Sequence, residues 1–199
     1  MSRWGRGRGG GIAVALAQAL LPANLAAQLG EAQFGGIASY GTSSAWHGGA
    51  GLIAGVGAGR LIYIGARWVY YFGSSAVQTD TGGTFQVRDR AQTFAADVGL
   101  QYPAGPVEVV AGVTIGAVRF TQQAEPVSAG TGTPQSSAGL EFLLAPNLSV
   151  QLRVSRFLLI PEFVYSFAGA PDLRWPVHQQ GPLLSLRVVM PFEVQRIRR

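Results

Sequence analysis

Apolar and polar residues alternate along most of this chain, and the alternation is most regular between residues 93 and 117. The apolar face of this stretch comprises Phe94, Ala96, Val98, Leu100 and Tyr102 and, after a break at 103–106, Val107, Val109, Ala111, Val113 and Ile115. A period of two residues predicts β-strands. In each strand the apolar face is unbroken over about the 9–11 residues of chain that a tilted strand needs to cross a bilayer, so the pattern predicts a hairpin that can span a membrane twice.

The same alternation predicts about eight strands along the chain. They are expected at 32–40, 48–58, 61–72, up to 102, 107–120, 137–144, from 148 onward and around 184–192. Long polar connections near 41–47, 73–84, 121–136 and 168–181 alternate with tight turns at 59–60, 103–106 and 145–147. An even number of strands with both ends of the chain on the short-turn side is typical of an outer-membrane barrel.

One segment departs from this rhythm. Between residues 154 and 167 the apolar residues change from even to odd positions, so that Phe163, Tyr165 and Phe167 face one way. A β-bulge near Arg156 would shift the phase by one residue, and a simple strand end would leave the same pattern. Pro161 is compatible with a rim or edge position, where no ladder donor is needed.

Composition supports membrane strands and not membrane helices. Charged residues make up 13% of the 199 residues and the mean hydropathy is +0.23. An apolar average without long apolar runs is expected where apolar and polar residues alternate.

The N-terminus predicts a cleavable signal peptide over residues 1–27. Arg3, Arg6 and Arg8 form a basic region, residues 12–21 an apolar region, and residues 22–27 are mostly small. An anchoring N-terminal helix is the alternative, although the apolar region is too short to span a membrane. Removing the three arginines lowers the formal net charge from +5 to +2, and the remaining excess lies in a basic tail, 194–199. Nucleic-acid binding is therefore not expected, and the lack of cysteine excludes disulfides and thiolate metal sites.

Aromatic residues gather near the predicted strand ends, as in the girdles of membrane barrels. Those toward the long connections are Tyr40, Trp68, Tyr70, Phe72, Phe120, Tyr165 and Phe167, and those toward the tight turns are Tyr102, Phe142 and Phe192. In a soluble sandwich or a lipocalin-like cup the same rings would form an ordinary core.

The polar face carries few charges, and they balance. Arg67, Arg153 and Arg187 stand against Asp97, Glu108 and Glu141. Side chains fill the inside of a barrel of about eight strands, and buried charges persist there only when they are paired and hydrogen-bonded. We therefore predict an internal ion-pair network of these six residues; on a soluble sheet they would be scattered solvent-facing charges.

The alternation in 185–192, which ends on Phe192, completes the pattern, and residues 32–192 resemble the small OmpA/OmpX-like outer-membrane β-barrels. The resemblance implies an all-β fold, an eight-stranded antiparallel up-and-down transmembrane β-barrel over residues 28–193, in the bacterial outer membrane. It also implies a monomer without cofactors that contacts outer-membrane lipid, lipopolysaccharide and the barrel assembly machinery, which recognises a terminal strand of this kind.

The expected function is a structural or surface-interaction role, with Trp46, Arg174 and Trp175 in loops that would meet a partner. A narrow or gated pore is the first alternative, since inward glycines would widen the lumen; these are Gly51, Gly55, Gly65, Gly99, Gly112 and Gly139. A lipid-modifying enzyme is the second, with His47 as a base near Ser44, Ser75 or Asp80. His47 and His178 alone are too few to predict a metal site.

Overall fold

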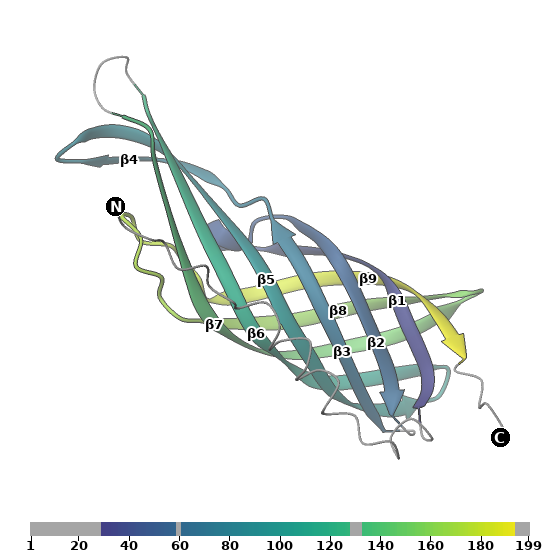
Figure 1. Cartoon of the computed structure of the whole chain (residues 1–199). Helices are drawn as coiled ribbons and strands as arrows, with labels where there is room; N and C mark the ends of the chain where they lie inside the picture. The colour runs from purple at the N-terminus through teal and green to yellow at the C-terminus, as the bar shows by residue number, and fades with distance from the viewer. Residues whose placement is uncertain (1–28, 59–60, 128–132, 194–199) are drawn as a thin grey trace, which may run out of the picture.

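The computed structural model describes residues 29–58, 61–127 and 133–193, so the predicted signal peptide and basic tail lie outside the described residues. The described chain is almost entirely β-structure (Figure 1). Its strands are β1 (Leu29–Gly41), β2 (Gly49–Ala58), β3 (Ile62–Tyr71), β4 (Ser75–Asp80), β5 (Gly83–Ala104), β6 (Val107–Pro126), β7 (Gln135–Val154), β8 (Phe157–Ala168) and β9 (Gly181–Glu193), with a 3-10 helix η1 (Ser44–Trp46). No helix in these ranges is long and apolar enough to cross a membrane.

Eight of these strands form a closed antiparallel barrel. Neighbouring strands pair in the order β3-β2-β1-β9-β8-β7-β6-β5, and β3 pairs with β5 to close the ring. The ninth strand, β4, pairs only with the outer half of β5, from Ser75 opposite Arg88 to Asp80 opposite Gly83. The predicted eight-stranded antiparallel barrel is therefore confirmed, and β4 is an additional strand within the predicted connection 73–84.

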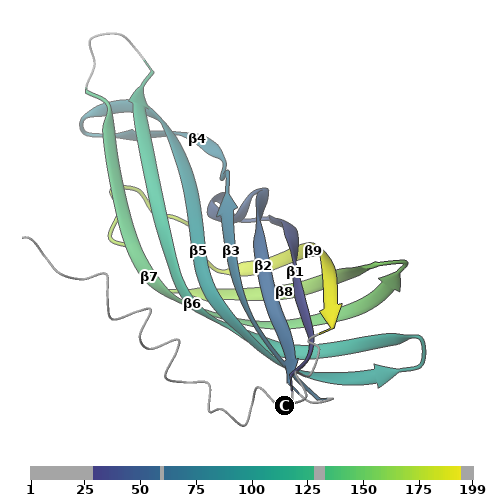
Figure 2. The same cartoon turned by 45° about the vertical axis from the view of Figure 1, so that its right-hand side comes forward.

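Three neighbouring strands are much longer than the rest. β5, β6 and β7 have 22, 20 and 20 residues, whereas the other barrel strands have 10 to 13. A tilted strand crosses a bilayer in about 9–11 residues, so roughly half of each long strand extends beyond the barrel body. Figure 2 shows the β4–β5 and β6–β7 hairpins projecting together from the end that carries the long connections.

The turn predicted at 145–147 is wrong. β7 continues through Ala145, Pro146 and Asn147, and the turn lies at Ser155 and Arg156, with Val154 opposite Phe157. Pro146 removes a ladder donor without ending the strand, because the β7–β8 register is the same on both sides of it. Ser155 takes a left-handed conformation (φ 56°), which two-residue hairpins require but which usually selects Gly, Asn or Asp.

The phase change after residue 154 comes from this hairpin and not from a bulge. In a two-residue hairpin the two residues that flank the turn face each other, so an even-numbered position is opposite an odd-numbered one and both point to the same side. The same change occurs at the β5–β6 turn, where Ala104 pairs with Val107. Four long connections and three tight turns remain, as predicted, because the strand predicted from 148 onward combines the end of β7 with β8.

Candidate functional site

The barrel interior is built in three layers. Toward the tight turns lies a small apolar cluster of Ile53, Leu158, Ile160 and Val189. Toward the long connections lies a larger apolar cluster that includes Ile37, Trp46, Val69, Tyr71, Val118, Phe120, Leu143, Val164 and Leu183. Between the two layers sit four buried charged side chains, Arg67, Asp97, Glu162 and Arg187.

The four charges come from two opposite walls of the barrel. On one wall Arg67 of β3 binds Asp97 of the adjacent strand β5, with Nε to Oδ2 at 2.9 Å and Nη2 to Oδ1 at 2.8 Å. On the other wall Arg187 of β9 binds Glu162 of β8, with Nε to Oε2 at 3.1 Å and a further contact from Nη2 to Oε1. Each pair is a diagonal contact between neighbouring strands, so the barrel register positions it.

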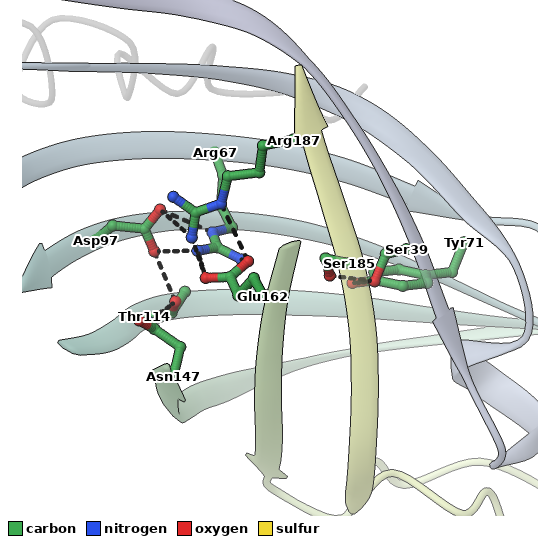
Figure 3. Close-up of polar contacts among 9 residues, drawn as sticks. All are labelled: Ser39, Arg67, Tyr71, Asp97, Thr114, Asn147, Glu162, Ser185 and Arg187. Atoms are coloured by element: carbon green, nitrogen blue, oxygen red, sulfur yellow. Dashed lines mark hydrogen bonds and ion pairs between the residues drawn. The ribbon is translucent and has the colours of Figure 1, made fainter. Parts of the chain in front are cut away.

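Arg67 joins the two walls. Its Nη1 donates to Oε2 of Glu162 at 3.1 Å and its Nη2 to Oε1 at 2.9 Å (Figure 3). Thr114 donates its hydroxyl to Asp97 Oδ1 at 2.6 Å, and Asn147 Nδ2 donates to the Thr114 hydroxyl oxygen at 3.0 Å. Two guanidinium groups therefore face two carboxylates in a neutral, hydrogen-bonded cluster.

Burial makes this cluster sensitive to change. Side-chain exposure is 7% for Arg67, 3% for Asp97, 0% for Glu162 and 5% for Arg187. Charges removed from water are tolerated when opposite charges and hydrogen bonds replace the lost solvation, which bidentate arginine–carboxylate pairs do well. Removing one member would leave a buried charge without compensation.

The space next to the cluster is small. A cavity of about 10 Å³ lies on its tight-turn side, beside Tyr63, Ser149 and Gln151. A cavity of about 20 Å³ lies on its long-connection side, beneath Trp46 and Tyr71. A water molecule needs about 10–15 Å³ of this kind of space, so each cavity has room for about one water.

Inward glycines do not widen the lumen near the turns. Gly55 and Gly65 both face the interior, and the ring of Tyr63 lies over them, so that a Cβ at either position would clash with it. Here glycine makes room for an aromatic side chain that fills the barrel.

The long-connection end is filled by a tryptophan from outside the strands. Trp46 of η1 is 1% exposed and packs edge-on against Tyr71 and Phe120, with ring centroids 4.8 Å and 5.7 Å away. Its Nε1 donates to the backbone oxygen of Gln179 at 2.9 Å. The connection after β1 is thereby tied to the neighbouring connection after β8 at the barrel mouth.

The second loop tryptophan is also buried. Trp175 packs against Phe85 of β5, and its backbone N–H and oxygen bond the side-chain amide of Gln122 at 3.1 Å and 3.3 Å. Arg174 beside it pairs with Asp80 at 2.6 Å. Trp46 and Trp175 therefore anchor the loops, because both rings are buried against other side chains of the protein.

Of the six charges predicted for the interior network, the structure brings together Arg67, Asp97 and Arg187. Glu108 is exposed beside the β5–β6 turn, and Glu141 lies against Gly169 at the loop end, beyond Leu143. Arg153 is exposed and pairs with Glu31 at 2.9 Å. The prediction of an interior position is therefore wrong for Glu108, Glu141 and Arg153. Arg153 lies two residues from the turn at Ser155, where the chain leaves the barrel.

Glu162 is the member of the cluster that sequence reasoning missed. It falls in the segment 154–167, where the apolar residues change from even to odd positions, and it is next to Phe163. The signal was nevertheless present, because if Phe163, Tyr165 and Phe167 face outward, then Glu162 faces inward.

Nine of the ten predicted girdle aromatics point outward or sit at the rim. Phe120 is the exception: it is 1% exposed and belongs to the interior cluster beneath Trp46. Phe142 is exposed but lies at the long-connection end, where its oxygen accepts from Gly169 N–H, and not beside a tight turn as expected. Its predicted side followed from the wrong turn at 145–147.

The residues considered for catalysis do not assemble a site. His47 is exposed and packs against Tyr40 with the two rings tilted by 58° and their centroids 4.9 Å apart, and Asp80 is paired with Arg174. Ser44 accepts from Ser74 through its backbone oxygen. Within the described ranges no group of three or more His, Asp or Glu side chains is placed to hold a metal ion.

Comparison with known proteins identifies the fold. No protein-family model matches the sequence, and no curated protein matches it as a relative. Among solved structures, a major outer membrane protein from Thermus thermophilus is similar at a TM-score of 0.62 and 16% identity, over 81% of this chain and 99% of that one. Neisserial surface protein A is similar at a TM-score of 0.56 and 12% identity, over 81% of this chain and 96% of that one. The attachment invasion locus protein Ail of Yersinia pestis, in complex with the heparin analogue sucrose octasulfate, is similar at a TM-score of 0.51 and 13% identity, over 82% of this chain and 99% of that one. The chain thus has the fold of the small outer-membrane β-barrels, as its resemblance to the OmpA/OmpX-like proteins implied.

Proposed function

We propose that this protein resides in the bacterial outer membrane as a closed barrel with a structural or surface-interaction role. The outward face of the barrel body is strongly apolar: Phe34, Leu52, Ile64, Val98, Leu148, Phe163 and Leu186 are all exposed. In water such a surface would aggregate, whereas in lipid it is the expected exterior of a membrane barrel. Long connections face the outside and tight turns the periplasm in barrels of this kind.

The observation that carries a closed interior is the ion-pair cluster that joins opposite walls. Arg67 and Glu162 meet across the lumen, and the adjacent cavities have room for about one water each. Above the cluster, Trp46 and Phe120 fill the mouth. A solute would have to displace both a tryptophan and a buried salt bridge to pass.

Conductance in planar bilayers tests this proposal. We expect the unmodified protein and the control double variant Glu108→Ser/Arg153→Ser to give no stable steps. Arg67→Ser/Glu162→Ser removes one charge of each sign from the centre and shortens two long side chains, so we expect small steps from this variant. Stable steps from the unmodified protein would support a pore, and silence from the Arg67/Glu162 variant would show that the cluster is not the barrier.

A gated pore is the second candidate, and one contact favours it. Arg187 Nη2 binds Glu162 and also lies 3.8 Å from Asp97 Oδ2. The guanidinium group could therefore switch from one carboxylate to the other, and such a switch would open and close the lumen. Conductance that appears only intermittently in the unmodified protein, and that vanishes when the cluster is made neutral and apolar, would favour gating.

The projecting hairpins supply the surface for interaction. β5, β6 and β7 carry their outer halves beyond the barrel body, and the packing of Trp175 on Phe85 holds the connection after β8 against them. The similar structure of Ail was solved with a heparin analogue, and for the present chain we propose a surface partner without specifying it. We further propose assembly as a monomer through β9, whose last outward aromatic is Phe192.

A further inference from the structure

The outer wall of the barrel carries a basic cleft next to the level where its apolar surface ends. The cleft has a volume of about 180 Å³ and is lined by Tyr70 of β3, Arg90 and Gln92 of β5, and Arg119 and Thr121 of β6. Register places these side chains side by side: Tyr70 is opposite Gln92, Gln92 opposite Arg119, and Arg90 opposite Thr121. Two guanidinium groups, a hydroxyl, a phenol and an amide therefore converge.

No ion pair within the described ranges engages Arg90 or Arg119. Asp89, the carboxylate next to Arg90 in the chain, accepts from Gln122. The outward carboxylate on β6, Glu125, is opposite Gln86, nearer the tip of the hairpin than Thr121. Arginines left without carboxylates, beside hydroxyl and amide donors, form a site suited to a phosphate group.

An apolar groove lies beneath this cleft; both are lined by β3, β5 and β6, and the groove extends further onto β1 and β2. Its floor is a row of three alanines that pair across β2, β3 and β5, namely Ala54, Ala66 and Ala96. Larger side chains surround the row, with Phe34 at one end, Ile115 at the other, and Leu52, Trp68 and Phe94 above. The groove is shallow and open, because alanine leaves a hollow where the neighbouring rows carry bulky residues.

The spacing of cleft and groove matches an amphipathic molecule. Gln92 and Ala96 lie on one face of β5, about 13 Å apart along the strand at roughly 3.3 Å per residue. At a strand tilt of about 40° this is a difference in depth of about 10 Å. Half of a bilayer's hydrocarbon core is about 15 Å, so the groove meets acyl chains when the cleft lies at headgroup level. Trp68 and Phe94 stand between them, where aromatic rings mark the boundary between lipid and water.

We propose that the cleft and groove together bind one phosphate-bearing lipid of the membrane leaflet at the long-connection end. Arg90 and Arg119 hold its phosphate, Gln92 and Thr121 bond the neighbouring oxygens, and an acyl chain lies over Ala54, Ala66 and Ala96. The inference rests on the membrane location proposed above and specifies a lipid partner for the barrel wall.

Native mass spectrometry of the detergent-solubilised full chain tests this site with lipid A that carries two phosphates. We expect the unmodified protein to retain one lipid, and Arg90→Gln/Arg119→Gln to weaken retention at least tenfold. Arg153→Gln/Arg156→Gln removes two arginines from the opposite rim and is the matched control, which we expect to retain lipid normally. Equal retention by both double variants would overturn the proposal.

Two further arms separate the parts of the site. Lipid A stripped of phosphate should bind about tenfold more weakly, and inorganic phosphate alone should not bind measurably at the same concentration. Ala66→Phe fills the groove and should weaken lipid retention, whereas Ala111→Phe, outward on β6 and outside the groove, should not. Lipid retention that does not change when the phosphates are removed or when Ala66→Phe fills the groove would refute the proposed lipid site. Every variant is first checked for heat-modifiable gel migration, which shows that the barrel has folded. Normal migration together with equal lipid retention in the site variants and their controls would reject the lipid site and leave the proposed membrane barrel standing.

Discussion

Arg67 binds Glu162 across the barrel with both terminal nitrogens, Nη1 to Oε2 at 3.1 Å and Nη2 to Oε1 at 2.9 Å. β3 and β8 lie on opposite walls, and the contact is buried between two apolar layers. A hydrogen-bonded salt bridge at this position couples the two halves of the ring. Its removal should therefore affect the whole barrel and not only one strand pair.

Glu162→Gln should be among the most destabilising single changes in the barrel. It leaves Arg67 and Arg187 buried with Asp97 as the one remaining carboxylate of the cluster, and breaking a buried pair in this way costs about 3–5 kcal/mol. Urea unfolding in lipid vesicles, followed by gel migration without heating, measures the loss. Glu108→Gln is the control, since Glu108 is exposed and should change the free energy of unfolding by less than about 0.5 kcal/mol. Equal losses in the two variants would mean that the buried cluster contributes nothing special.

Arg67→Met should partly rescue Glu162→Gln. The double variant removes one positive and one negative charge, so Asp97 and Arg187, 3.8 Å apart, remain as a neutral pair. Coupling within such networks is about 0.5–3 kcal/mol, and we expect the double variant to be more stable than Glu162→Gln alone. The same unfolding assay completes the mutant cycle, and strictly additive losses would argue against charge balance as the cause.

Trp46→Ala should loosen the long-connection end of the barrel. The substitution removes a buried ring that contacts Tyr71 and Phe120, a change that costs about 3–5 kcal/mol in a packed core. Proteolysis of the folded protein should then cut the connections after β1 and β8 faster. Trp46→Phe keeps an aromatic ring but loses the hydrogen bond to Gln179. We expect the loss of this bond to lower the free energy of unfolding by only about 1 kcal/mol. Unchanged cleavage in Trp46→Ala would show that the loops are held by other contacts.

Ser155→Asn should stabilise the β7–β8 turn, and Ser155→Val should destabilise it. The left-handed conformation at this position (φ 56°) suits asparagine, whereas it costs ordinary L-residues about 1–2 kcal/mol and is worse for a β-branched side chain. We expect a gain of a few tenths to about 1 kcal/mol for asparagine and a loss of about 1–2 kcal/mol for valine. Refolding into vesicles over a urea series gives both values. The reverse order would contradict the turn at Ser155.

Sequence patterns predicted the strands and their faces well wherever the alternation was uninterrupted. β1, β2 and β3 lie within a few residues of their expected ranges, and the β5–β6 turn falls at the predicted break. The errors gather where turn chemistry is unusual. Pro146 and Asn147 are typical turn residues but lie within β7, whereas Ser155 and Arg156 are not and form the turn.

Local preference cannot decide between these two positions, because a turn is selected by the pairing of whole strands. Placing the turn at Ser155 lets β7 pair with β8 in one register from Leu143 opposite Ala168 to Val154 opposite Phe157. A turn at 145–147 would have removed this pairing between β7 and β8 and its backbone hydrogen bonds. Phe120 was misplaced for a related reason: an aromatic residue near a strand end suits a girdle or a core equally, and the loop residue Trp46 that covers it is far away in the chain.

The sequence by itself determined the period of two, the number of barrel strands and the faces of Arg67, Asp97 and Arg187, since side-chain direction in a strand follows from position alone. Only the tertiary structure decided that Glu162 completes their cluster, that Arg153 and Glu108 stay outside it, and that two loop tryptophans pack inward. The physical reason is that closure of the ring fixes which distant strands face each other. Contacts across the lumen depend on register and shear, which no single strand encodes.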